Sequence, residues 1–257
     1  MAELCSELDV LLHVGHARST KQTEETARSE RYAFLQSTAE QRGARYLATA
    51  HTANDQAETI LHRIIRGTGP KGLAGIQQTR KLSEAVTVVR PMLWATREQV
   101  LLYLTRIEQD YRVDESNTDA RFTRNRIRHE LLPHLAQHYN SSIIESLLRL
   151  GQLSAEVHEV IQSEVGLGLE ECIKAKSNNT VELNRAHLIA KSDFLLRETL
   201  VAVWREQGWP EQSMGFEQWA RLARAVRTGN TICLPGGVRV TSDAGDIRLH
   251  RSEDSDD

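Results

Sequence analysis

The stretch that decides the fold reads RYLATAHTANDQAETILHRIIRG and runs from Arg45 to Gly67. Its first part predicts a strand over Arg45–Ala50 that ends at His51. From Asn54 onward the apolar residues recur at helical spacing, and Gly67 supplies a stop, so a helix is predicted there. A strand followed directly by a helix is the building unit of α/β proteins.

The same alternation continues on both sides of this stretch. Further strands are predicted at Leu8–His13 and Val86–Val89, and further helices at Thr23–Gln41 and Thr96–Gln109. Thr96 and Gln99 have the spacing of a capping box, which marks the start of the last of these helices. The expected fold class is α/β, with a Rossmann-like parallel sheet. We expect this sheet to be incomplete, because the chain begins after the strand and phosphate-binding turn with which such sheets normally start.

The pattern changes near residue 140 from strand–helix alternation to long amphipathic helices. Helices are predicted from Asn140 to Ile161, at Phe194–Gln207 and at Gly215–Val226, and short strands at Thr231–Leu234, Val238–Thr241 and Ile247–His250. We therefore expect a catalytic α/β domain over 1–139 and a mostly helical, substrate-binding domain ending in short antiparallel strands over 140–251. An acidic tail, 252–257, is expected to be disordered.

Composition excludes several classes of protein. The 257 residues carry a formal net charge of -3, so the chain as a whole does not have the basic balance typical of nucleic-acid binders. Cys5, Cys172 and Cys233 have no paired spacing, which favours isolated reduced thiols over a disulfide framework or a zinc site. No apolar run reaches the ~18 residues of a membrane span, and Met1–Asp9 has no basic start, so we expect a cytoplasmic protein.

The strongest chemical signal lies where the predicted strand Arg45–Ala50 passes into the following helix. His51 stands where the strand ends, which is where open α/β sheets bind ligands. Asp55 and Glu58 are three apart and therefore share one face of the helix. Two carboxylates at that place could hold Mg²⁺ while leaving coordination positions for substrate phosphates. The alternative is that they only complement the positive N-terminal end of the helix.

Cationic residues form three further candidate sites. Arg28 and Arg31 share a face of the first long helix, with Tyr32 beside them, and suit a polyphosphate or a carboxylate. Arg66 and Lys71 belong to a glycine-rich loop that could contact an anion or RNA. This loop follows a helix, so it is not a dinucleotide-binding fingerprint. The alternative for Arg28 and Arg31 is a solvated helix face that pairs with Glu24 and Glu25, and the alternative for Arg66 and Lys71 is an ordinary connecting loop.

The third basic site is a run of arginines that follows an acidic segment. It contains Arg121, Arg124, Asn125, Arg126 and Arg128. Phosphate backbones are bound by patches of this kind, and the asparagine adds directional hydrogen bonds. The alternative is a solvated helix start whose charge is balanced by the preceding acids.

The order and spacing of these motifs are more specific than any one of them. The motifs are ETARSERY at 25–32, ATAH at 48–51, DQAET at 55–59, RGTGPKGL at 66–73, RPML at 90–93, DESN at 114–117 and RNRIR at 124–128. Together they closely resemble the tRNA(Ile)-lysidine synthase family, which belongs to the PP-loop ATP pyrophosphatases. The resemblance is specific over residues 23–135 and weaker beyond them.

This resemblance implies a reaction and its participants. Members of the family use ATP to adenylate the C2 oxygen of the wobble cytidine of tRNA(Ile) with a CAU anticodon, and L-lysine then displaces AMP. The resemblance implies ATP and Mg²⁺ as cofactors, and a homodimer is one option for its assembly. The implied roles are as follows: catalysis by Arg31, His51, Asp55 and Glu58; ATP binding by Arg28, Arg31 and His51; metal binding by Asp55 and Glu58; RNA binding by Arg66, Lys71, Arg121, Arg124, Asn125, Arg126 and Arg128.

Two features depart from the family pattern. Asn54 stands where the family has the first of two aspartates, and no Ser-Gly-Gly-x-Asp-Ser loop, which binds ATP phosphates in the family, occurs in the chain. We expect a shortened lysidine synthase chain. Two alternatives stay open: a noncatalytic tRNA-binding relative, and another PP-loop enzyme such as a tRNA thiolase. The thiolases commonly use paired cysteines, which this chain lacks.

Overall fold

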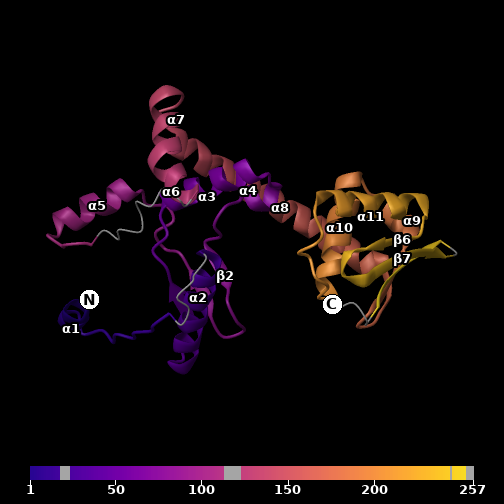
Figure 1. Ribbon diagram of the computed structural model, residues 1–257, viewed down its shortest axis with the longest axis horizontal. Coiled ribbons are helices and arrows are strands. Elements are labelled where there is room, and N and C mark those ends of the chain that lie inside the picture. The colour runs from indigo at the N-terminus through magenta and orange to yellow at the C-terminus, as the bar shows by residue number, and fades with distance from the viewer. Residues whose placement is uncertain (18–23, 113–122, 244, 253–257) are drawn as a thin grey trace. The chain divides into compact units, whose positions relative to one another are not determined.

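The computed structural model describes residues 1–17, 24–112, 123–243 and 245–252, together with the backbone but not the side chains of 24–25 (Figure 1). The chain divides by its internal contacts into two compact units, Met1–Ala155 (unit 1) and Glu156–Asp257 (unit 2). This division falls inside the long helix α8, Ile143–Cys172. Among the described residues, no helix has both the length and the apolar character needed to cross a membrane.

Unit 1 combines a small sheet with several helices. Its elements are α1 (Ala2–Glu7), α2 (Glu24–Gln41), β1 (Tyr46–Ala48), α3 (Ala53–Arg66), α4 (Pro70–Leu73), β2 (Thr79–Lys81), β3 (Thr87–Val89), α5 (Arg97–Arg106), α6 (Thr123–Arg126), the π-helical turn η2 (Ile127–Leu131), α7 (Leu132–His138) and the start of α8. The strand order is β1-β3-β2, with β1 parallel to β3 and β2 antiparallel to it. The expected α/β class and the parallel strand pair are confirmed.

The parallel pair fixes the place of the site. In register, Tyr46 lies opposite Thr87, and Ala48 lies opposite Val89. Because the two strands run in the same direction, the chain leaves both at one edge, which we call the C-terminal edge. From β1 it continues into His51, and from β3 into Arg90. Ligands of open α/β sheets bind at such an edge.

Helix α3 begins at the C-terminal edge and is held there from both ends. Thr52 caps it, and Thr52 and Asp55 form a reciprocal capping box. Gly67 ends it with φ +75°, a left-handed conformation that glycine adopts without a steric penalty. Between these ends one face is fully buried, and its Ala57 and Ile60 belong to a small core with Ile127, Leu132 and Leu147.

One predicted strand is absent. Leu8–His13 is not a strand, and its apolar side chains are exposed, with Leu8 at 63% and Leu11 at 80%. An apolar run becomes a strand only where a neighbouring strand accepts its backbone hydrogen bonds, and the described sheet of unit 1 ends at β1 and β2. The prediction of a buried strand at Leu8–His13 is wrong for that reason.

Unit 2 is an antiparallel sheet packed against helices. Beyond α8 its elements are β4 (Ile173–Lys176), β5 (Thr180–Asn184), α9 (Arg185–Ile189), α10 (Asp193–Glu206), α11 (Phe216–Thr228), β6 (Ile232–Leu234), the 3-10 turn η3 (Pro235–Gly237), β7 (Val238–Asp243) and β8 (Asp246–Arg251). The strand order is β4-β5-β8-β7-β6. Helices α9, α10 and α11 gather on one side of this sheet (Figure 1). The predicted helices at Phe194–Gln207 and Gly215–Val226 and the three terminal strands are confirmed, whereas β4 and β5 were not predicted.

Candidate functional site

His51 lies at the C-terminal edge, between β1 and α3, and is half-buried. Its Nδ1 atom is 2.9 Å from the Oγ1 atom of Thr49. Burial lowers the pKa of His51; the charge of Asp55 opposes this change, and the guanidinium groups of Arg90, Arg124 and Arg28 add to it. His51 is therefore a neutral imidazole at neutral pH, which can accept a proton from a reacting group.

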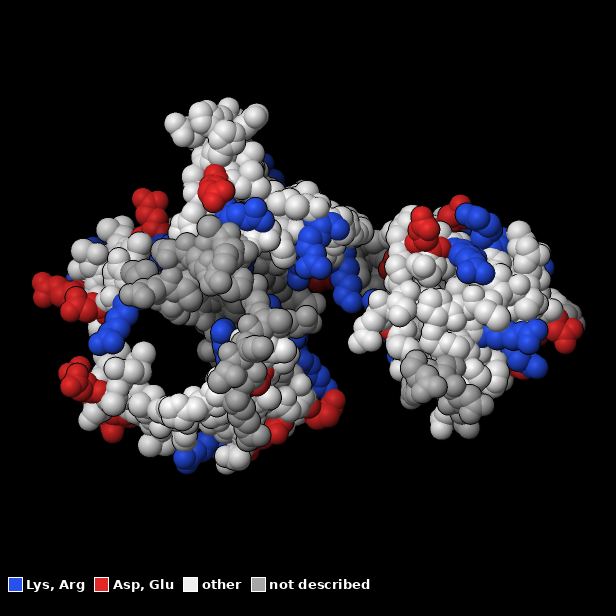
Figure 2. Space-filling view, viewed as in Figure 1, with Lys and Arg blue, Asp and Glu red and all other residues white. Residues whose placement is uncertain are grey.

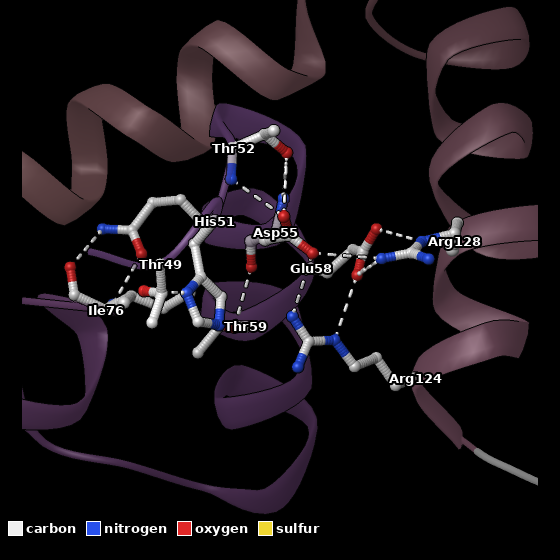
Figure 3. A network of polar contacts seen from close by, with 10 residues as sticks. Thr49, His51, Thr52, Asp55, Glu58, Thr59, Ile76, Arg124 and Arg128 are labelled. Carbon is white, nitrogen blue, oxygen red and sulfur yellow. Dashed lines mark hydrogen bonds and ion pairs between the residues drawn. The ribbon is translucent and has the colours of Figure 1, made fainter. Parts of the chain in front are cut away.

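Asp55 and Glu58 project from the first turns of α3 toward α6 and η2, where they meet two arginines (Figure 3). Arg124 donates from Nε to Glu58 Oε2 at 3.1 Å and from Nη2 to Asp55 Oδ1 at 3.3 Å. Arg128 donates from Nε to Glu58 Oε1 at 2.5 Å and from Nη2 to Asp55 Oδ1 at 3.1 Å. We call these four residues the carboxylate–guanidinium cluster.

Every carboxylate oxygen of this cluster has a hydrogen-bond donor. The second oxygen of Asp55, Oδ2, accepts from the backbone N of Thr52 at 2.8 Å and from its Oγ1 at 2.9 Å. Glu58 is only 1% exposed, so its charge depends on the two guanidinium groups for compensation. The hydrogen bond that Arg128 donates to Glu58 raises the pKa of Arg128, and burial of the guanidinium group opposes that change. The predicted shared face of Asp55 and Glu58 thus exists, and it binds protein cations.

These contacts limit the ability of Asp55 and Glu58 to bind the expected Mg²⁺. Mg²⁺ in proteins is held by one or two carboxylates, with water and phosphate oxygens in the remaining positions. Asp55 and Glu58 are carboxylates, but both already hold guanidinium groups. Among the described residues, no group of three or more His, Cys, Asp or Glu side chains could hold a metal ion. The donor set in this arrangement does not fit a Mg²⁺ bound by the protein alone, and the metal role of the two carboxylates stays a prediction.

A cavity of about 270 Å³ opens beside the cluster. One side is polar, with Asn54, Asp55, Glu58, Arg97 and Arg128. The other side is apolar and consists of Val100, Leu101 and Leu104 of α5 with Tyr111. The cavity therefore offers anionic, cationic and apolar contacts to one small molecule.

Helix α5 is positioned by backbone contacts at the start of α3. The backbone N of Ala53 donates to Ala95 O at 2.9 Å, and the backbone N of Arg97 donates to Asn54 Oδ1 at 2.7 Å. The capping box predicted for Thr96 and Gln99 is present and starts α5. Asn54, which replaces the aspartate of the family pattern, therefore fixes the apolar wall of the cavity against its polar side.

The glycine-rich loop 67–75 is anchored from the other face of α3. Gln56 Nε2 donates to Ala74 O and Ile76 O, at 3.2 and 3.3 Å. Arg63 Nη1 donates to the carbonyl oxygens of Gly72 and Gly75, each at 2.7 Å. These bonds fix the backbone of the loop, while the side chains of Arg66 and Lys71 are exposed.

The remaining predicted residues lie in several places. Arg28 stacks over the ring of Tyr32 at 5.7 Å and acts electrostatically on His51. Arg31 lines a separate cavity of about 700 Å³ that contains neither His51 nor Asp55. Asn125 is partly buried, and Arg126 is exposed. Arg121 and the acidic segment before it lie outside the described residues. On the visible face, basic and acidic side chains are interspersed over both units, without a face-wide field of either sign (Figure 2).

Sequence reasoning missed three residues of this region. Arg90 follows β3 at the C-terminal edge, Arg97 lines the cavity, and Thr52 holds Asp55. Thr52 could have been found, since it precedes Asp55 by the capping-box spacing of three. Arg90 also carried a signal, because it directly follows a predicted strand. Arg97 has no such signal, because its place in the cavity depends on how α5 packs.

Comparisons with known proteins agree with the resemblance in the motifs. A family model for the PP-loop domain matches residues 1–135. A tRNA(Ile)-lysidine synthase from Gloeobacter violaceus is 36% identical over 232 residues, which are 90% of this chain and 69% of that protein. Proteins of the same name from Rhodopirellula baltica and Symbiobacterium thermophilum are each 32% identical, over 87% and 98% of this chain.

The chain is shorter than these relatives, since it covers 62% of the Rhodopirellula protein and 55% of the Symbiobacterium protein. Among solved structures, the U34-tRNA thiolase NcsA from Methanococcus maripaludis matches with a TM-score of 0.48 and 17% identity, over 60% of this chain and 55% of that one. That likeness is too slight to bear on function. The family model and the curated relatives are sufficient: this chain belongs to the tRNA(Ile)-lysidine synthase family of PP-loop proteins.

Proposed function

We propose that this chain acts in the ATP-dependent ligation of L-lysine to C2 of the wobble cytidine of tRNA(Ile). The observation that carries the proposal is the cavity beside the carboxylate–guanidinium cluster. It places two carboxylates, two arginines and an aliphatic wall around about 270 Å³. This volume lies below the ~300 Å³ at which pockets for drug-sized ligands begin, so it suits a ligand the size of an amino acid.

The lining of the cavity matches the chemistry of free lysine. Asp55 pairs with Arg124 and Arg128 but is still 19% exposed, so it can accept one more hydrogen bond from an ammonium group, and Arg97 suits a carboxylate. The methylene stem of lysine can lie along Leu101 and Leu104 of α5. No other common amino acid combines an aliphatic stem of that length with two ammonium groups. In this proposal the cluster and cavity hold lysine for attack on the activated base.

The neutral imidazole of His51 provides the proton acceptor that this attack requires. An amine attacks as the free base, and the proton it loses on bond formation must pass to a neighbouring group. His51 lies at the C-terminal edge, and its lowered pKa keeps it unprotonated at neutral pH. We assign it as the general base of the lysine step, with Arg28 and Arg31 as the cations proposed for the phosphates of ATP. Mg²⁺, in this proposal, comes with ATP and neutralises charge on its phosphates.

The proposed RNA contacts are sorted by what each cation already binds. Arg124 and Arg128 are engaged by Asp55 and Glu58, so we assign them first to the cluster. Arg66, Lys71 and Arg126 are exposed and make no ion pair with a described residue. Exposed cations of this kind bind phosphate backbones with a strong dependence on salt. We propose these three as the tRNA contacts within the described residues.

The first test is direct binding of lysine. Calorimetry on the 257-residue chain should show binding of L-lysine and at least ~10-fold weaker binding of L-norleucine, which lacks the second amine. Arg97→Ala should weaken lysine binding by a similar factor. Arg106→Ala, at the other end of α5 and outside the cavity, is the matched control and should leave binding unchanged.

Incorporation of labelled lysine into tRNA(Ile) then tests the reaction itself. Failure to bind lysine, or equal binding of norleucine, would refute the assignment of the cavity. Binding of tRNA(Ile) without lysine binding or incorporation would favour a noncatalytic tRNA-binding relative.

A further inference from the structure

Arg90 stands out because its side chain is buried and forms no ion pair with a described residue. It is 3% exposed, and no other Lys or Arg among the described residues is buried as deeply. A buried cation is normally paired with a carboxylate, because removing it from water is costly. Arg124 and Arg128 have such partners, but Arg90 has no ion pair with any described residue. The function proposed above assigns no role to Arg90.

The hydrogen bonds of Arg90 leave two of its three guanidinium nitrogens unpaired among the described residues. Nη1 donates to Gln77 O at 2.6 Å. Nε is buried and has no hydrogen-bond partner. Nη2 likewise makes no hydrogen bond to a described residue, and it is not among the fully buried, unsatisfied atoms. Nε and Nη2 form the edge with which arginine binds the two oxygens of a carboxylate or phosphate in parallel.

The position of Arg90 in the fold also favours the binding of an anion. It directly follows β3, and its backbone N donates to Gln78 O at 2.9 Å, which fixes it at the C-terminal edge. The positive charges of Arg28, Arg90 and Arg124 all lower the pKa of His51, so their field reaches this edge. The carboxylates beside them, Asp55 and Glu58, are already bound by Arg124 and Arg128. Among the described residues, no further carboxylate at this edge forms an ion pair with Arg90.

The backbone at the start of α3 does not supply the open donors. The N atom of Ala53 donates to Ala95 O, and the N atom of Asp55 donates to Thr52 Oγ1. The N atom of Thr52 donates to Asp55 Oδ2. These three backbone donors are occupied, whereas Nε and Nη2 of Arg90 make no hydrogen bond to a described residue and can serve an incoming anion.

We propose that Arg90 is the central residue of an oxyanion site at the C-terminal edge, which takes phosphate or pyrophosphate on its Nε–Nη2 edge, with Arg28 as the nearby second cation. The planar fork suits a phosphate group, whose oxygens are spaced for two parallel hydrogen bonds. The inference rests on the proposed function only for the source of the phosphate, since that reaction releases pyrophosphate from ATP. Binding of the anion itself needs neither tRNA nor lysine.

The test compares the parent chain with Arg90→Met and Arg90→Lys. Calorimetry with inorganic pyrophosphate, orthophosphate and ATP distinguishes the possible sources, and thermal unfolding is followed in pyrophosphate and in sodium chloride of equal ionic strength. For the parent we expect pyrophosphate to raise the Tm, because it binds the folded state. Arg90→Met should bind pyrophosphate at least ~10-fold more weakly. Its Tm in chloride should equal or exceed that of the parent, because a buried uncompensated charge has been removed.

Arg42→Met provides the matched control, because Arg42 is exposed after the end of α2. It should bind pyrophosphate like the parent. Arg90→Lys keeps the charge but not the fork, so it should fold and bind with intermediate affinity. If Arg90→Met does not fold by circular dichroism, Arg90→Lys decides the question, and parent-like affinity in that variant overturns the proposal.

Two further outcomes also count against the site. One is the absence of any response of the parent chain to pyrophosphate or orthophosphate at millimolar concentration, and the other is parent-like affinity in Arg90→Met. Either result overturns the inference. Lysine binding in the same preparations is the readout of the proposed function. Anion binding without lysine binding therefore refutes only the proposed function, and lysine binding without anion binding refutes only the role of Arg90.

Discussion

Units 1 and 2 differ in the side chains that are buried in their interiors. In unit 2 a continuous apolar core fills the space between the sheet and the helices, and Leu200, Trp204 and Leu249 in it are fully buried. In unit 1 the apolar cluster around Ala57 and Ile60 is small, and charged side chains are buried close to it. Glu58 is 1% exposed and lies on the same helix as that cluster.

The difference indicates which unit is specialised for binding. Buried charges contribute little net stability, because the cost of removing them from water offsets their attraction. An apolar core of the same size would stabilise unit 1 as well or better. The charges of unit 1 lie at the C-terminal edge, where such sheets bind ligands. We infer that the buried charges of unit 1 lower its stability and form a ligand-binding site. The apolar core of unit 2 mainly stabilises its fold.

The largest expected effect is that of Glu58→Ala. The substitution leaves Arg124 and Arg128 without their main partner, and breaking a buried ion pair from one side costs about 3–5 kcal/mol. Hydrogen exchange measured by mass spectrometry should show faster exchange in α3 and unchanged exchange in α10. Glu84→Ala removes an exposed pair with Lys81 and is the control. Unchanged exchange in α3 would show that the carboxylate–guanidinium cluster does not stabilise unit 1.

How much of this cluster was predictable depends on the sequence distance involved. The shared face of Asp55 and Glu58 follows from their spacing of three on a helix, and it was predicted correctly. Their partner Arg128 lies 70 residues from Glu58 along the chain, and no periodicity links the two. Sequence alone therefore assigned Arg124 and Arg128 to RNA, whereas the structure pairs them with the carboxylates.

Patterns between neighbouring residues predicted elements of the fold correctly, whereas elements that depend on distant residues were predicted wrongly or missed. The capping box of Thr96 and Gln99 depends on neighbouring residues, and its helix starts as predicted. Leu8–His13 has the composition of a strand, but strand formation needs a partner that the run itself cannot specify. Strands β2 and β4 were missed because their residues, TRK and IKAK, are mostly polar and exposed.

The second prediction concerns the core of unit 2. Leu200 is fully buried in the same core as Trp204, whose ring lies 5.1 Å from that of Trp209 and 5.4 Å from that of Trp219. Leu200→Ala should cost about 2–5 kcal/mol through lost burial and the cavity left behind. Tryptophan fluorescence reports this unfolding well, because three of the four tryptophans lie in unit 2.

Leu200→Ala and Glu58→Ala should accelerate hydrogen exchange in different units. For Leu200→Ala, hydrogen exchange should increase in α10 and β8 and stay unchanged in α3. If each substitution accelerates exchange equally in both units, the two units unfold together. The division into a charged binding unit and an apolar scaffold would then have no energetic meaning.

The smallest expected effect is a pH dependence that arises from His51. Its pKa in the folded chain lies below the ordinary 6.5, mainly because it is partly buried. Below pH 6.5 the unfolded chain therefore binds a proton that the folded chain does not. The free energy of unfolding should fall as the pH is lowered from 7 through this window, and the change should stop once the folded imidazole is also protonated.

His51→Gln removes the titrating group and should flatten this part of the pH profile. Urea unfolding of parent and variant at several pH values between about 7.5 and about 5, the range in which an imidazole titrates, measures the difference in slope. A ring-proton titration by nuclear magnetic resonance, assigned with the variant, gives the pKa of His51 independently. A variant with the parent's slope, or a ring that titrates at 6.5, would show that burial does not lower the pKa of His51. A ring whose pKa lies well above neutral pH would be cationic there and could not accept a proton from lysine, and the general base would then have to be another group at the C-terminal edge.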